Sequence, residues 1–378
     1  MPVAACPAAA SSIETGRDAV TFAKTGTDHP LVAKVRDYAD TVLRPRALAT
    51  DRDGVDTAHI EELAALGLLN HTAPPRYGGA GVDRETDRQV HEIIAGACFN
   101  TWLVWAQHAS LSERISTLEA TGAPIPPLAQ RILRGELLLG AGVSDVRRYP
   151  DHYIAARKAE GGWIFDGTVS WVSGWGLNSA LTVAAVEKDT ETVVTALVPV
   201  DDRLHSAGPL ALGAVAGSRT ARVALRDVFV PEENVLTTES IERARFLDQG
   251  VSNDARAQHF GLADTVLREL ELTPEQPAQQ VAAVWRPRFD QLRTTAYDLS
   301  DEARTHGGGA YRAEDRLAVK VAVGEALSAI TRALLIARSG RGLAGDDTAQ
   351  LYARTALFLL VQGQSADVRR AQLAELTA

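Results

Sequence analysis

Hydrophobic residues recur three and four positions apart through the first third of the chain. This spacing occurs in residues 31–48, 57–69, 83–118 and 128–133. A period near 3.6 residues is typical of helices that bury one face. Pro74, Pro75, Gly78 and Gly79 interrupt the pattern and predict a loop before the third of these segments. The first third of the chain therefore predicts a helical domain.

The middle third carries a different pattern. Short runs rich in β-branched residues follow one another, with Gly, Asp and Pro between them, at residues 137–143, 153–157, 163–165, 168–173, 181–186, 193–200 and 221–230. Asp166-Gly167 is a hairpin-turn signal. Strands at short spacing without helices between them predict an antiparallel barrel or sandwich. No G-x-G-x-x-G follows a strand, so a Rossmann sheet is not indicated.

Helical periodicity returns after residue 240. Four long helices are expected, at residues 241–271, 277–305, 311–339 and 346–376, which is the content of a bundle. The predicted fold class is therefore α+β, with an N-terminal helical domain, a middle antiparallel β-barrel and a C-terminal four-helix bundle. The expected divisions are a disordered tail at 1–27, and domains at 28–136, 137–236 and 237–378.

Composition narrows the class of protein. The chain has 39 Lys and Arg against 48 Asp and Glu, a net charge of −9, which argues against a general nucleic-acid binder. Cys6 and Cys98 cannot form a disulfide framework, and no Cys/His spacing suits a metal ion. No apolar run reaches the ~20 residues of a membrane span. Residues 1–12 lack the basic start of a signal peptide, so we expect a cytoplasmic protein.

Several segments carry recognisable motifs. They read APPRYGGAG at residues 73–81, GGWIFDGTVSWVSG at 161–174, GSRT at 217–220, LRDVFVPEENVL at 225–236 and ALFLLVQGQ at 356–364. Together and in this order they resemble segments of the acyl-CoA dehydrogenase superfamily. The resemblance implies the three-part fold predicted above, with FAD bound between the parts and a homodimer or homotetramer as the assembly.

The resemblance also suggests residues for the flavin. Trp171 would lie against the isoalloxazine and the Ser173 hydroxyl near its N5, where an aromatic surface excludes water. The alternative is that Trp171 belongs to the barrel core and Ser173 ends a strand. Further cofactor-binding candidates, by position in the family motifs, are Ser144, Arg341, Gly342, Gly363 and Gln364. Arg341 and Gly342 would contact the FAD pyrophosphate of a neighbouring subunit; the alternative is an ordinary helix end with a solvated arginine.

The position of the catalytic base departs from the family pattern. Gln362 stands where the family has its glutamate, and an amide does not accept a proton at neutral pH. Asp254, on the first helix of the bundle, is the candidate replacement, although a surface aspartate is an equal alternative. His108 follows an apolar helix and is a third candidate for the substrate pocket, against the structural role that a lone histidine more often has.

Three functions are compatible with these residues. The first is a dehydrogenase that desaturates an acyl thioester, carried by CoA or acyl-carrier protein, and passes electrons to a partner. The second is a monooxygenase on the same fold, which takes reduced flavin, FAD or FMN, from a reductase and needs no such base. The third is a non-catalytic scaffold. The overall resemblance favours the first, whereas the missing glutamate favours the second; the small-molecule substrate is not indicated.

Overall fold

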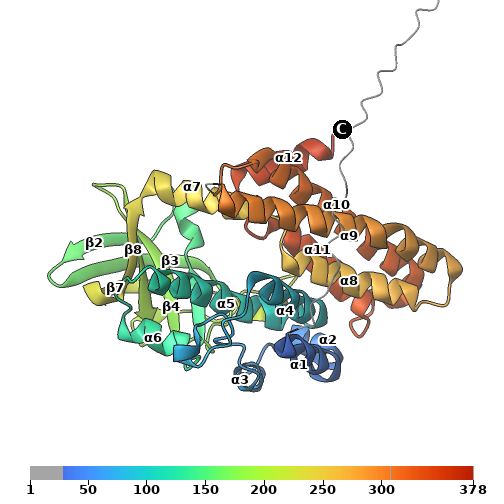
Figure 1. Ribbon diagram of the computed structural model, residues 1–378, viewed down its shortest axis with the longest axis horizontal. Coiled ribbons are helices and arrows are strands. Elements are labelled where there is room, and N and C mark those ends of the chain that lie inside the picture. The colour runs from blue at the N-terminus through green and yellow to red at the C-terminus, as the bar shows by residue number, and fades with distance from the viewer. Residues whose placement is uncertain (1–28, 307, 378) are drawn as a thin grey trace, which may run out of the picture.

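The computed structural model describes residues 29–306 and 308–377, so the tail expected at residues 1–27 lies outside the described residues. N-terminal helices, a middle sheet and C-terminal helices follow one another along the chain (Figure 1). The predicted α+β class is confirmed. Within the described residues, no helix combines the length and apolar character needed to cross a membrane.

The N-terminal part contains six α-helices. They are α1 (Pro30–Tyr38), α2 (Arg44–Asp53), α3 (Thr57–Ala65), α4 (Arg84–Ala97), α5 (Phe99–Ala120) and α6 (Pro127–Leu133), with the short helices η1 (Ala39–Leu43) and η2 (Pro75–Tyr77) between them. The Asp56 carboxylate accepts from the third N–H of α3, and Asp83 does the same for α4. The single helix predicted at 83–118 is two helices, because Cys98 has an extended backbone that ends α4.

The middle part is an eight-stranded sheet. Its strands are β1 (Leu139–Gly142), β2 (Ala155–Ala159), β3 (Gly162–Val172), β4 (Ala180–Glu187), β5 (Thr192–Pro199), β6 (Leu204–His205), β7 (Ala221–Pro231) and β8 (Val235–Ser240), with η3 (Ser144–Arg148), η4 (Ala216–Ser218) and η5 (Glu232–Asn234) between strands. The order is β6-β7-β3-β2-β4-β5-β8, and β1 pairs with β4. β1 and β2 pair with β4 in parallel, whereas the other pairs are antiparallel as expected. The chain reverses direction between β2 and β3 and reverses again before β4, so β2 and β4 run the same way.

The C-terminal part contains α7 (Ile241–Ser252), α8 (Ala257–Glu271), α9 (Gln276–Thr305), α10 (Ala313–Arg338), η6 (Ser339–Leu343), α11 (Thr348–Val361) and α12 (Ala366–Glu375). The prediction of one helix at 241–271 is wrong, since the chain breaks between α7 and α8. The prediction at 346–376 is wrong in the same way, because Gly363 adopts a φ of +63° between α11 and α12.

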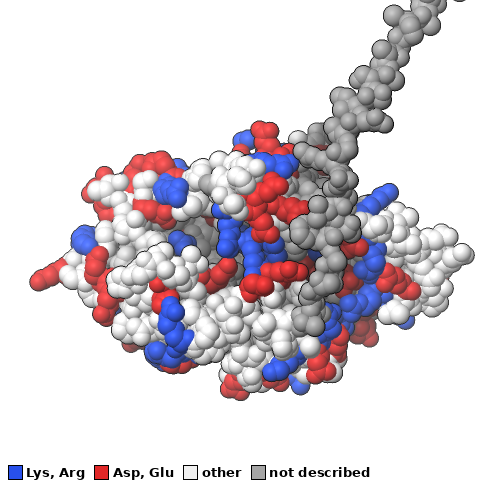
Figure 2. Space-filling model, in the orientation of Figure 1, with Lys and Arg blue, Asp and Glu red and all other residues white. Residues whose placement is uncertain are grey.

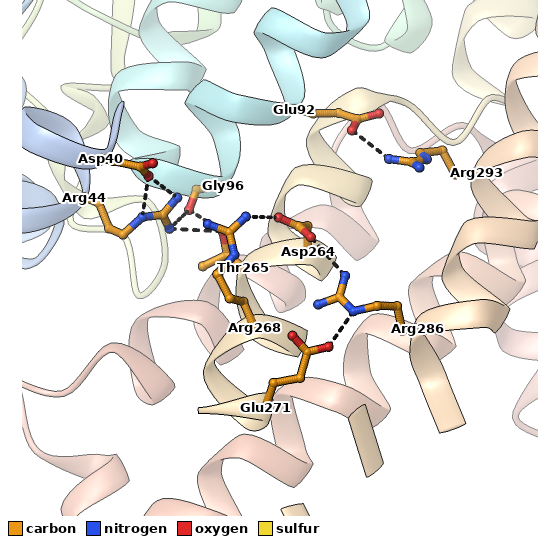
Figure 3. Close-up of polar contacts among 10 residues, drawn as sticks. All are labelled: Asp40, Arg44, Glu92, Gly96, Asp264, Thr265, Arg268, Glu271, Arg286 and Arg293. Atoms are coloured by element: carbon orange, nitrogen blue, oxygen red, sulfur yellow. Dashed lines mark hydrogen bonds and ion pairs between the residues drawn. The ribbon is translucent and has the colours of Figure 1, made fainter. Parts of the chain in front are cut away.

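Two glycines bring the N-terminal helices against the bundle. A Cβ on Gly261 of α8 would lie 2.1 Å from the carbonyl oxygen of Glu92 on α4. One turn further, the Thr265 hydroxyl and Arg44 Nη1 both donate to the carbonyl of Gly96, at 2.7 and 3.0 Å (Figure 3). The helical parts consequently share one apolar core, while the sheet encloses a separate one.

Candidate functional site

Trp171, which the motif resemblance assigns to a flavin, is the last residue but one of strand β3. The register between β3 and β7 shifts between Val169 and Val172, and Trp171 lies inside this bulge. Its side chain is 38% exposed, the most of the six tryptophans. Because a bulge re-aims the side chains of a strand, the indole stands outside the sheet core. The alternative role for Trp171, a barrel-core residue, does not fit this exposure.

Ser173 is placed differently. It is 2% exposed, and its hydroxyl lies 2.9 Å from the Thr220 hydroxyl, which in turn lies 2.7 Å from that of Ser218. Asn178 donates to the Ser173 carbonyl at 2.9 Å. Ser173 therefore belongs to a buried chain of hydroxyls, and a hydrogen bond from it to a flavin would have to replace the one to Thr220.

The short helix η3 follows β1 beside these residues. Its Ser144 is half-buried, while the next residue, Asp145, accepts the backbone N–H of Ser170 at 2.9 Å. Arg147 donates to both carboxylate oxygens of Asp248 on α7, at 2.5 and 2.7 Å. The charged groups of η3 are thus engaged by β3 and α7.

Gln362 caps α11 and is paired with a second amide. Gln258 Nε2 on α8 donates to Gln362 Oε1 at 3.0 Å. A Cβ added to the adjacent Gly363 would meet no described atom within 4 Å, so this turn borders open space. Gln364 instead bonds Gln372 of α12. The turn therefore presents an amide pair at the position where the family resemblance implies a glutamate.

Asp254 is held by a buried cation. Arg316 Nε donates to its Oδ1 at 2.7 Å, and the Ser300 hydroxyl to its Oδ2 at 3.2 Å. The two side chains of this ion pair are 11% and 4% exposed. Both carboxylate oxygens are thus committed to α9 and α10, which speaks against a free base at this position.

His108 is enclosed entirely and bonded only to backbone. Its Nε2 lies 2.6 Å from the carbonyl of Leu69, and its Nδ1 accepts the N–H of Leu139 at 3.1 Å. The hydrogen must therefore be on Nε2. Burial lowers the pKa of His108 to about 4, so the ring joins α5 to β1 as a neutral group.

We expect His108→Gln to make folding less sensitive to acid. Because the folded pKa lies below the ordinary value of 6.5, the unfolded chain binds more protons between the two values, and stability falls as the pH drops through that range. The free energy of unfolding, measured with urea, should fall between pH 7 and pH 5 by about 2 kcal/mol less in the variant than in the wild type. His205→Gln, at an exposed position, should keep the wild-type loss; an unchanged loss in His108→Gln would contradict the assignment.

His71 and His91 form a cluster around Asp87 that the sequence did not indicate. The Trp102 indole donates to His91 Nδ1 at 3.0 Å, and His71 Nε2 lies 2.7 Å from Asp87 Oδ1. His91 Nε2 is 3.7 Å from the same oxygen, and its ring centroid is 4.5 Å from that of Trp105. The only signal in the sequence is the spacing of four between Asp87 and His91 on one helix. The cluster places a partly exposed carboxylate between two imidazoles.

The turn η6 is open to its surroundings. Arg341 is 67% exposed and its Nε lies 3.3 Å from Asp347, whereas Gly342 is buried against Arg338. Ile336 and Leu343 on either side are 70% and 73% exposed. The turn thus combines an exposed cation with two exposed apolar side chains.

The predicted site residues are distributed over separate elements. Within the residues that the structure describes, no hydrogen bond or ion pair joins one of them directly to another, and no three His, Cys, Asp or Glu side chains form a metal-sized group. Two surface cavities, of about 330 and 560 Å³, lie in the helical part and are lined by none of them. On the face drawn in Figure 2, side chains of both charges are interleaved rather than segregated.

Known sequences similar to this chain include several acyl-CoA dehydrogenases. The model of the acyl-CoA dehydrogenase N-terminal domain matches residues 25–124. The probable acyl-CoA dehydrogenase YngJ of Bacillus subtilis is 28% identical over 62% of this chain and 64% of its own length. The human mitochondrial short-chain specific acyl-CoA dehydrogenase is 25% identical over 70% of this chain and 66% of its own length. These matches span just under two thirds of each relative. An L-evernosamine nitrososynthase of Micromonospora is 29% identical over 44% of this chain and 41% of its own length.

Solved structures share the whole fold. Butyryl-CoA dehydrogenase from Megasphaera elsdenii superposes with a TM-score of 0.76 at 17% identity, covering 92% of this chain and 97% of that one. The structure of PigA with FAD and proline superposes with a TM-score of 0.75 at 13% identity. The match covers 95% of this chain and 99% of that one. At such identities the likeness establishes the fold alone.

Proposed function

Because this chain belongs to the acyl-CoA dehydrogenase superfamily, we propose that it is an FAD-dependent oxidoreductase whose flavin lies against Trp171. Three features of the chain support this proposal. The Trp171 indole is exposed, the Gly363 turn borders open space, and Arg341 is available on η6 for a phosphate. A second copy of the chain covering Ile336 and Leu343, as a homodimer or homotetramer, would complete the site.

One observation supports a particular class of reaction, namely the amide pair of Gln362 and Gln258. Desaturation of an acyl thioester needs a side chain that accepts a proton from carbon. Gln362 has no such capacity, and Asp254 is committed to Arg316. We therefore favour a monooxygenase supplied with reduced flavin by a reductase over an acyl-thioester dehydrogenase with an electron-transfer partner. A bound flavin would supply the redox chemistry.

The chain's own residues would then bind and orient the flavin and the substrate. Trp171 would exclude water from one face of the ring system, and the paired amides would offer neutral hydrogen bonds without removing a proton. The similarity to an L-evernosamine nitrososynthase supports an amine substrate rather than an acyl thioester.

Flavin titrations test both parts of the proposal. Trp171→Ala should weaken binding of FAD, measured by ultrafiltration, about tenfold, because the ring loses its aromatic contact. Trp285→Ala on α9 is the matched control and should bind normally. With reduced FAD and oxygen, the wild type should form product from an amine substrate. Anaerobic bleaching of bound FAD by butyryl-CoA would instead establish a dehydrogenase, and absence of any flavin binding a scaffold.

A further inference from the structure

A cavity of about 330 Å³ lies where the start of α2, the second half of α8, the end of α10 and the start of α11 meet. Six of its seven lining residues are polar: Arg44, Thr265, Arg268, Glu269, Arg338 and Thr348. The lining thus has three guanidinium groups, two hydroxyls and one carboxylate. It carries two more positive than negative charges.

The one carboxylate in the lining is already satisfied. Glu269 accepts from Arg338 Nη2 at 2.9 Å, from the Thr348 hydroxyl at 2.9 Å and from the Tyr352 hydroxyl at 3.1 Å. Arg338 Nε, by contrast, is buried and has no hydrogen-bond partner within the described part of the chain. A buried N–H of a cation without an acceptor is unfavourable, so an anionic oxygen beside it would be stabilised.

The other two arginines are balanced only by exposed groups. Arg44 meets Asp40 at 3.3 Å, and Arg268 meets Asp264 at 2.6 Å (Figure 3). Asp264 is shared with Arg286, at 3.0 Å. These two carboxylates are 49% and 44% exposed, and solvent screens charges at such positions. Within the lining itself, three guanidinium groups therefore face a single carboxylate.

We propose that this cavity binds a phosphate-bearing ligand through Arg268 and Arg338. Guanidinium groups bind phosphate oxygens in pairs. The Thr265 and Thr348 hydroxyls already donate to the carbonyl of Gly96 and to Glu269, so the arginines carry the proposal. None of these residues is among those named above for the flavin, so pyrophosphate binding at this cavity can be tested whatever the outcome there. The phosphate could come from a free phosphate compound or from the diphosphate of FAD held by a second copy of the chain.

Calorimetric titration of the full chain with pyrophosphate at low salt tests the proposal. Arg268→Gln and Arg338→Gln should each weaken binding about tenfold, through loss of a charge-assisted pair. Arg286→Gln is the matched control, because Arg286 shares Asp264 but does not line the cavity; it should stay within about twofold. If Arg338→Gln fails to fold, Arg268→Gln remains decisive, since that side chain is 44% exposed.

Parallel titrations with FAD and riboflavin identify the source of the phosphate. If Arg268→Gln weakens FAD but not riboflavin, the ligand is the flavin diphosphate. If it weakens pyrophosphate and leaves FAD unchanged, the ligand is a separate phosphate compound. Absence of pyrophosphate binding to the folded wild type, equal affinity in Arg268→Gln, or an equal loss in Arg286→Gln would each overturn the proposal.

Discussion

Replacement of Arg316 by methionine is expected to lower the free energy of unfolding by about 3–5 kcal/mol, the range for breaking a buried ion pair. Arg316 binds Asp254 through Nε at 2.7 Å and the carbonyl of Gly309 through Nη1 at 3.1 Å, and its remaining nitrogen donates to the carbonyl of Gly250. Methionine would fill similar space but leave a carboxylate that is 11% exposed without its counter-charge. The carbonyl of Gly250, in the last turn of α7, would also lose its hydrogen-bond donor.

Urea unfolding followed by far-ultraviolet circular dichroism measures this loss. Arg312→Met, which removes a surface cation paired with Asp315 and Glu302, should change stability by no more than about 0.5 kcal/mol. The double variant Arg316→Met with Asp254→Leu should recover much of the loss, because no lone charge then remains buried. If the single variant matches the Arg312 control, the ion pair does not stabilise the fold.

Gly261→Ala is expected to cost about 3 kcal/mol, the upper end of the range for an overpacked contact. Its new Cβ would lie 2.1 Å from the Glu92 carbonyl oxygen and 2.9 Å from the Glu92 Cα. Both are backbone atoms, so α4 and α8 would have to move apart. The separation would also stretch the hydrogen bond from Thr265 to the carbonyl of Gly96 (Figure 3).

The matched control is another glycine inside a helix. A Cβ on Gly324 of α10 would meet, among described atoms, only the tip of Leu360 at 3.0 Å, and a flexible side-chain end can shift. Alanine is also favoured over glycine in helices by about 1 kcal/mol. Gly324→Ala should therefore keep or raise the thermal midpoint that Gly261→Ala lowers. Equal midpoints for the two variants would show that the two helices do not need this close approach.

Hydrophobic periodicity predicted the order of the three parts because it records which face of each segment is buried. It did not predict where individual helices end. Residues 241–271 show one continuous helical pattern, yet the chain breaks after Ser252. The carbonyls of Gly250 and Ser252 are bonded by Arg316 and Lys320, which lie 66 and 68 positions later. A helix end stabilised by such distant side chains leaves no local signal.

The sequence by itself determined the three-part architecture, the motif positions and the amide character of Gln362. The tertiary structure decided which polar groups are free to act. It joined His108 to backbone atoms, tied Asp254 to Arg316 and gathered Asp87 between His71 and His91. The reason is physical: residue spacing specifies the face on which a side chain lies, whereas its hydrogen-bond partners come from elements distant along the chain.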